Sequence, residues 1–172
     1  MSKNKKLNLR GITAGAMMAA LSIILERIIP LMPASNMMDI RVSLSNIPLI
    51  LASVLVSPVL GAIAGVVSDI VGCFINGYAP FPLLTLAPLV MGCLPGVILH
   101  KKSTYSFFRV FVAVIVSHLI ASVIITTIGL SVMRGEPLVI MFIKRLPTCG
   151  INFVIDTSLV YLLLKTPLSK KF

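Results

Sequence analysis

The chain has 172 residues, of which 58% are hydrophobic and only 12% are charged, and its formal net charge is +10. A water-soluble domain cannot bury this much apolar surface, so the composition predicts an integral membrane protein and argues against a soluble enzyme. The positive charge then marks loops on the cytoplasmic side of a membrane, and we expect no nucleic-acid partner.

The first predicted helix runs from Gly11 to Leu31, behind the basic N-terminal segment MSKNKKLNLR. A membrane span needs about 20 apolar residues, and this segment is long enough for one. Its start is similar to a signal peptide, but no convincing cleavage site follows and more apolar segments come later. We therefore interpret it as a retained helix whose basic N-terminus lies in the cytoplasm.

The apolar stretch from Leu44 to Ile75 is long for one membrane span and short for two. Two crossings place the lysines at 101–102 and near the C-terminus in the cytoplasm, whereas one crossing would place them outside. Two crossings are therefore predicted, with the turn at Ser57–Pro58, because proline opens a helix well and breaks one badly. The helix before this turn, Ile47 to Val56, is then only about 15 Å long and has to pack against other helices.

Three longer apolar segments follow, and each is long enough for one helix. They are Leu83 to Leu99, Phe107 to Val132 and Ile140 to Leu164. The predicted fold is thus an all-α integral membrane protein, a single domain over 1–172 with six transmembrane helices and both termini in the cytoplasm. We expect the loop from Pro33 to Asn46 to line a cavity on the outer side, because irregular backbone at membrane depth needs protein or water around it.

Basic residues also occur on the predicted outer side, where positive charge is disfavoured. One explanation is local pairing with acids of the same region, and the other is a basic entrance for an anionic solute. The cations are Arg27, Arg41, Arg134, Lys144 and Arg145, and the acids are Glu26, Asp39 and Glu136.

Two acids and one histidine lie deep within the predicted spans. Asp69 follows Pro58 by eleven residues, so it lies about 16 Å along its helix. A charged group at such depth costs about 2.5–3.5 kcal/mol and is a functional candidate by default. The alternative is a structural acid that accepts hydrogen bonds between helices. His118 and Asp156 fall at a similar depth, and a contact between them is the structural alternative to a ligand role.

Small residues recur at helical spacing in two of the predicted helices. In the first helix, Ala16 and Ala20 are four residues apart, which forms a flat stripe. Such a stripe suits packing within the bundle or docking of another membrane subunit. In the third helix, Gly61 and Gly65 form a GxxxG pattern, which predicts close packing within the chain.

Motifs for catalysis, nucleotide binding and metal binding are missing from the sequence. It has no GxxxxGK[ST], GxGxxG, HExxH or GxSxG pattern. The three cysteines, Cys73, Cys93 and Cys149, show no metal-binding spacing. We therefore predict no enzymatic activity, no metal site and no cofactor, and energy for any transport has to come from a partner or an ion gradient.

Four segments of the chain resemble one family of membrane proteins. They are AMMAALS in the first helix, LERIIP at Leu25 to Pro30, DIRVSLSNIPLILASVLVSPVLGAIAGVVSDIVG from Asp39 and YAPFPLLTL from Tyr78. Over nearly its whole length the chain resembles the substrate-binding S component of an energy-coupling-factor (ECF) vitamin transporter, and within that family the folate-specific type. The resemblance implies capture of the vitamin from outside a bacterial cell membrane. It also implies a complex with a transmembrane T component and two ABC ATPases, docked on Ala16 and Ala20.

A folate ligand implies a site with two chemically different ends. Its glutamate carboxylates suit Arg41 or Arg145, and the N–H donors of its pterin suit acceptors such as Asp69. Its aromatic body suits a wall of aromatic or methionine side chains. The predicted substrate-binding residues are Arg41, Ser43, Asn46, Asp69, Tyr78, Phe81, Arg145 and Asn152.

Two alternatives to folate capture remain open. Sibling S components take other vitamins, such as pantothenate or riboflavin, and share much of the same pattern. A stand-alone secondary carrier or an intramembrane enzyme would instead use Asp69, His118 and Asp156. Copurification of a T subunit and ATPases separates an S component from this second alternative.

Overall fold

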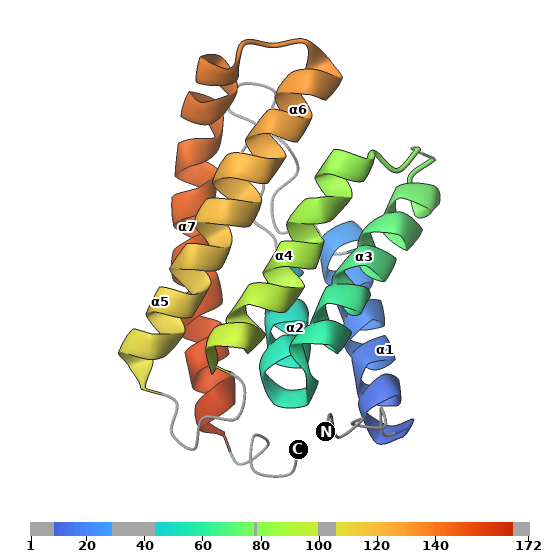
Figure 1. Ribbon diagram of the computed structural model, residues 1–172, viewed down its shortest axis with the longest axis vertical. Helices are drawn as coiled ribbons and strands as arrows, with labels where there is room; N and C mark the ends of the chain where they lie inside the picture. Colours follow the sequence, from blue (N-terminus) through green and yellow to red (C-terminus); the bar gives the residue numbers. More distant parts are fainter. Residues whose placement is uncertain (1–8, 29–43, 78, 100–105, 167–172) are drawn as a thin grey trace, which may run out of the picture.

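The computed structural model describes residues 9–28, 44–77, 79–99 and 106–166. These residues form a bundle of six continuous helices, three of which contain a π-helical segment (Figure 1). No strand occurs within the described ranges. The helices are α1 (Leu9–Ile23) with η1 (Ile24–Ile28), α2 (Asn46–Leu51) with η2 (Ala52–Val56), α3 (Pro58–Ile75), α4 (Pro82–Leu99), α5 (Phe107–His118) with η3 (Leu119–Ile125) and α6 (Thr126–Arg134), and α7 (Leu138–Lys165).

The predicted helix boundaries agree with the structure to within two residues for the second, fourth, fifth and sixth helices. The predicted turn at Ser57–Pro58 is also confirmed. Ser57 has extended backbone, with φ −169° and ψ 142°, and Pro58 is the first residue of α3. Proline is tolerated there because the first N–H groups of a helix have no partner within the helix.

Four of the helices are long and apolar enough to cross a membrane: α3, α4, the continuous helix from Phe107 to Arg134, and α7. The apolar helices Gly11–Glu26 and Asn46–Val56 are shorter. The first turn of α1 and the last turn of α7 lie at the same end of the bundle (Figure 1), as an even number of crossings requires. Six crossings and cytoplasmic termini remain predictions.

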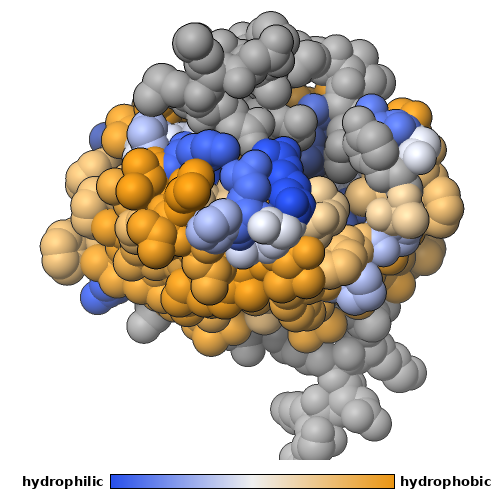
Figure 2. Space-filling view, turned by 90° about the horizontal axis from the view of Figure 1, so that it is seen from above, coloured by the Kyte–Doolittle hydropathy of each residue, from blue (hydrophilic) through white to orange (hydrophobic). Residues whose placement is uncertain are grey.

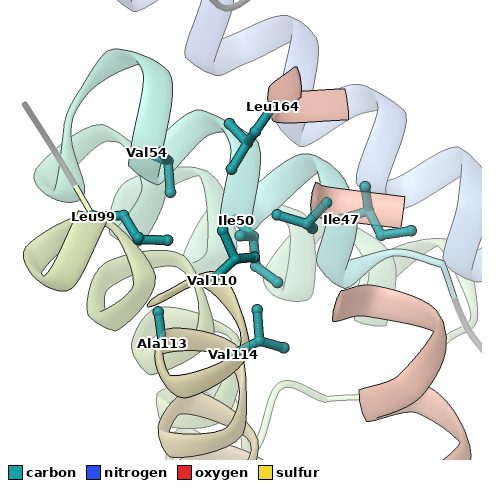
Figure 3. Packing of buried hydrophobic residues seen from close by; sticks show 9 residues of the cluster. Ile47, Ile50, Val54, Leu99, Val110, Ala113, Val114 and Leu164 are labelled. Atoms are coloured by element: carbon teal, nitrogen blue, oxygen red, sulfur yellow. The ribbon is translucent and has the colours of Figure 1, made fainter. Parts of the chain in front are cut away.

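The short second helix, α2 with η2, packs inside the bundle, as its length predicted. Its side chains Ile47, Ile50 and Val54 belong to one buried cluster with Leu99 of α4 and Val110 of α5 (Figure 3). Between helices in lipid there is little hydrophobic driving force, so a short helix is held by close packing and by hydrogen bonds. Full burial of Ile50 shows that the packing around α2 is close.

Helices α3 and α4 approach each other backbone to backbone. A methyl group built on Gly61 would collide with the carbonyl oxygen of Gly92, and one built on Gly65 would collide with the carbonyl oxygen of Pro88. Only glycine leaves room for this approach. The GxxxG pattern of the third helix is therefore a packing motif within the chain, as predicted, and its main partner is α4.

A hydroxyl group joins the short helix to α4. Ser53 is fully buried, its Oγ accepts a hydrogen bond from the Gly96 N–H at 2.9 Å and donates one to the Cys93 carbonyl at 3.3 Å. Pro95 lies inside α4 and has no N–H to donate, so one hydrogen bond of the helix is missing next to this contact. Ser53 thus supplies a polar partner at the point where the helical ladder is broken.

Candidate functional site

A row of polar contacts runs between α7 and the helix formed by α5 and η3. His118 Nε2 lies 2.9 Å from Asp156 Oδ2, and Ser122 Oγ lies 3.1 Å from Cys149 Sγ. Arg145 Nη2 donates to Ser122 Oγ at 3.4 Å. Because the two helices are antiparallel, these contacts form a polar seam that extends from Asp156 toward the end of the bundle where α6 and α7 meet.

Asp156 is the centre of this seam. Its side chain is fully buried, and Oδ2 accepts from His118 Nε2 and from Asn46 Nδ2, the latter at 3.0 Å. The predicted contact between His118 and Asp156 is confirmed. The contact between Asn46 and Asp156 could not be predicted from the sequence, because 110 residues separate them and no spacing pattern links them.

The seam also brings one further predicted residue near Asp156. Asn152 is half-buried and lies four residues before Asp156, so the two share one face of α7. Arg145 is half-buried and lies on the same seam. Of the predicted binding residues, Asn46, Arg145 and Asn152 are therefore grouped around α7.

Asp69 occupies a different place in the bundle. The Thr85 hydroxyl of α4 donates to Asp69 Oδ2 at 2.8 Å, which joins α3 to α4. This contact is the helix-bridging hydrogen bond that was expected as the alternative to a ligand role for Asp69. Phe81 is half-buried just before α4, and its carbonyl also accepts from the Thr85 hydroxyl, at 3.3 Å. A part for Asp69 and Phe81 in binding stays a prediction.

One of the outer cations is explained by local pairing. Lys144 Nζ lies 2.9 Å from Glu136 Oε2, and both side chains are more than a third exposed. Such a pair contributes about 0–1 kcal/mol to stability. Seen from the end of the bundle where α6 and α7 meet, hydrophilic residues gather in the middle of the surface, and hydrophobic residues lie below them and on both sides (Figure 2). Some predictions lie outside the described residues or side chains: those on Arg27, Asp39, Arg41, Ser43 and Tyr78, and most of the loop from Pro33 to Asn46 that was expected to line a cavity.

The fold and the polar seam can be compared with known proteins. A family model described as the S component of the ECF-type riboflavin transporter matches residues 6–170. The chain belongs to this family of ECF transporter S components. The S component is thus a membrane-embedded transporter subunit and not an enzyme. This confirms the predicted membrane transport role and the prediction that the chain is not an enzyme.

Among curated proteins, the S component is similar to the folate transporter FolT of Clostridium novyi (strain NT). The two are 31% identical over 124 residues, which is 71% of either chain. The solved structure of FolT bound with folic acid matches with a TM-score of 0.77 and 24% identity, over 96% of this chain and 95% of that one. The S component for biotin from an ECF-type ABC transporter matches with a TM-score of 0.62 and 21% identity, with the same coverage. The two structures show that the fold is shared.

The first helix of the S component has two different small-residue faces. Gly15 and Ala19 are buried, and Ala19 belongs to a cluster with Leu49 and Ala64. Ala16 and Ala20 are exposed on a neighbouring face of the helix. The structure therefore assigns internal packing to the first pair and leaves the second pair available on the surface.

Proposed function

We propose that the S component captures folate from outside a bacterial cell. It then delivers the folate into the cell together with a transmembrane T component and two ABC ATPases. The 31% identity to a folate transporter over 71% of both chains carries this proposal. The fold shared with FolT bound to folic acid supports it. Riboflavin is the second candidate, because the matching family model is described by that vitamin.

The polar seam suits a long ligand with two chemically different ends. Arg145 and Asp156 are eleven residues apart on α7, so about 16 Å of helix separates them. A guanidinium pairs well with a carboxylate, which suits the glutamate of folate. Carbonyl and carboxylate oxygens deeper in the bundle accept hydrogen bonds, which suits the amino-substituted ring. In this proposal Arg41 or Arg145 holds the carboxylate end.

The remaining predicted residues complete this arrangement. Asn46, Asn152 and Asp69 receive the hydrogen-bond donors of the ring, and aromatic side chains form the wall against which it stacks. The full proposed set is Arg41, Ser43, Asn46, Asp69, Tyr78, Phe81, Arg145 and Asn152.

In this proposal the partner subunits supply the ATPase activity, because the sequence has no nucleotide-binding motif. The exposed pair Ala16 and Ala20 is the proposed docking surface, since small residues let another helix approach closely. This pair is separate from the polar seam, so docking and substrate binding involve different residues.

Binding by the purified S component tests the substrate. The protein is titrated with folate, riboflavin and biotin in detergent, and small molecules released on denaturation are identified by mass spectrometry. We expect folate to be bound and released, and the other two to bind far more weakly. Tight riboflavin binding without folate binding would contradict the proposal. Failure to copurify with a T component and ATPases from the native host would contradict the proposed partners.

A further inference from the structure

A shallow groove lies on the surface of the bundle, between the end of the helix Phe107–Arg134 and the start of α7 (Figure 1). Its volume is about 350 Å³, and all but one of its lining residues are apolar. The apolar lining residues are Val123, Ile124, Ile128, Leu138, Val139 and Phe142. Most of these side chains are exposed, and both helices are long and apolar enough to cross a membrane. The groove therefore opens toward the hydrocarbon of the membrane.

A buried hydroxyl group also lines this groove. Thr127 is 4% exposed, and its Oγ1 has no hydrogen-bond partner among the described residues. A threonine in a helix commonly donates to a carbonyl of the preceding turn, as Thr126 does to the Ala121 carbonyl at 2.8 Å. Buried polar atoms are nearly always hydrogen-bonded, so Thr127 Oγ1 points to an acceptor from outside the described part of the chain.

A cation lies above the groove on the same face of α6. Arg134 follows Thr127 by seven residues, which is close to two full helical turns, so the two side chains share one face about 10 Å apart along the axis. Arg134 is exposed. Lys144 and Glu136 form an ion pair and cancel each other's charge. This end of the α6–α7 hairpin therefore keeps a net positive charge, to which Arg134 contributes.

The order of these groups matches the order of groups in an anionic phospholipid. From the membrane surface inward, such a lipid presents a phosphate, ester carbonyl groups and acyl chains. The hairpin presents a guanidinium, a hydroxyl group and an apolar groove in the same order. A guanidinium pairs with a phosphate, and a hydroxyl group donates to an ester oxygen. A transmembrane helix of another subunit fits less well, because its backbone carbonyls are already hydrogen-bonded within the helix.

We propose that the groove between α6 and α7 binds one anionic phospholipid from the leaflet at this end of the bundle, which is the outer leaflet in the predicted topology. One acyl chain lies in the groove, an ester oxygen accepts from Thr127, and the phosphate pairs with Arg134. None of the groove residues belongs to the proposed substrate-binding set. The lipid site therefore does not rest on the proposed function.

An introduced tryptophan can report which lipid lies in the groove, because the sequence contains no tryptophan. Phe142→Trp places the reporter in the groove. Phe74→Trp is the matched control, because Phe74 is exposed near the end of α3 and does not line the groove. The full chain is reconstituted into vesicles of phosphatidylcholine and phosphatidylglycerol, one of which carries bromine in its acyl chains. Bromine quenches tryptophan fluorescence only at close range, so the quenching identifies the neighbouring lipid.

At Phe142→Trp we expect phosphatidylglycerol to be preferred over phosphatidylcholine about fivefold, as expected for one cation beside an anionic headgroup. At Phe74→Trp we expect no preference. Adding Arg134→Gln to Phe142→Trp should abolish the preference, because it removes the charge. Adding Thr127→Val should weaken both lipids equally, because both contain the ester groups that accept from the hydroxyl.

Two results would overturn the lipid site. One is equal quenching by the two lipids at Phe142→Trp, or a preference that survives Arg134→Gln. The other is the absence of quenching at Phe142→Trp while Phe74→Trp is quenched, which would show that protein fills the groove.

Thermal unfolding shows whether each variant is folded. If Phe142→Trp does not fold, Val139→Trp replaces it, with Val154→Trp as its control, because both valines are exposed on α7 and only Val139 lines the groove. Folate binding by the same proteins is measured separately. Loss of the lipid preference with folate binding retained would therefore count against the lipid site alone.

Discussion

Asn46 Nδ2 lies 3.0 Å from Asp156 Oδ2, across 110 residues of sequence. This hydrogen bond attaches the first turn of the short helix α2 to the middle of α7. The same oxygen accepts from His118 of α5, so one carboxylate links three helices. The arrangement places three linked polar side chains inside the bundle, which is the basis for placing the substrate there.

Removal of the Ser53 hydroxyl should destabilise the S component. Ser53→Ala leaves the Gly96 N–H without its acceptor in a buried position, and a buried unpaired donor costs about 1–3 kcal/mol. We expect a lower midpoint of thermal unfolding in detergent. Ser158→Ala is the control, because its exposed hydroxyl bonds only within its own helix. Equal midpoints for the two variants would show that Ser53 does not stabilise the contact with α4.

A single methyl group should disrupt the contact between α3 and α4. Gly61→Ala collides with the backbone of Gly92, and overpacking of this kind costs about 1–3 kcal/mol. Gly150→Ala makes the same chemical change in α7, where no atom lies within 4 Å of the new methyl group. It should leave stability unchanged or raise it, since alanine favours helix by about 1 kcal/mol. The stability of both variants is measured by thermal unfolding. A comparable loss of stability in Gly61→Ala and Gly150→Ala would contradict the close approach of α3 and α4.

Adjacent positions on α1 should respond differently to a bulky side chain. Ala20→Trp falls on the exposed face, so we expect folate binding to be retained and uptake by the assembled transporter to be lost. Ala19→Trp falls in the buried cluster with Leu49 and Ala64, so it should reduce folding and binding together. Binding by purified protein and uptake by cells are measured for both. Normal uptake with Ala20→Trp would contradict a docking role for this face.

Membrane topology can be tested by labelling single cysteines in a variant without Cys73, Cys93 and Cys149. Ser106→Cys, at the start of α5, should react with a membrane-impermeant reagent only from the cytoplasm. Ala79→Cys, between α3 and α4, should react only from outside. Both positions are exposed. The inverted result, with Ser106→Cys labelled only from outside and Ala79→Cys only from the cytoplasm, would contradict two crossings by residues 44–75.

The carboxylate end of the site should be revealed by comparing folate with pteroate, which lacks the glutamate. Arg41→Ala is expected to weaken folate about ten- to a hundredfold, since a charge-assisted hydrogen bond contributes about 1.5–3 kcal/mol. Pteroate should change little. Lys144→Ala is the control cation, because Lys144 is paired with Glu136 at the surface. An equal loss for folate and pteroate would show that Arg41 does not hold the glutamate.

The sequence alone was sufficient to predict the helices of this protein. Long apolar segments, the positions of lysines and one proline at a turn are local features, and they predicted the short helix that ends at Val56 and the start of α3 at Pro58. The GxxxG pattern at Gly61 likewise predicted close packing. The membrane makes these features reliable, because each span has to satisfy its own backbone hydrogen bonds and meet lipid with apolar side chains.

Apart from the predicted contact between His118 and Asp156, only the tertiary structure decided which polar groups meet. Asp69 and Asp156 are both acids within predicted spans, yet Asp69 accepts from Thr85 of the next helix, whereas Asp156 gathers Asn46 and His118. It also decided that Ala19 is buried while Ala20 is exposed, although both lie in the same small-residue stretch. These outcomes depend on how each helix is rotated and which helix lies beside it. Such contacts between distant segments are set by the packing of the whole bundle, which periodicity along the chain does not specify.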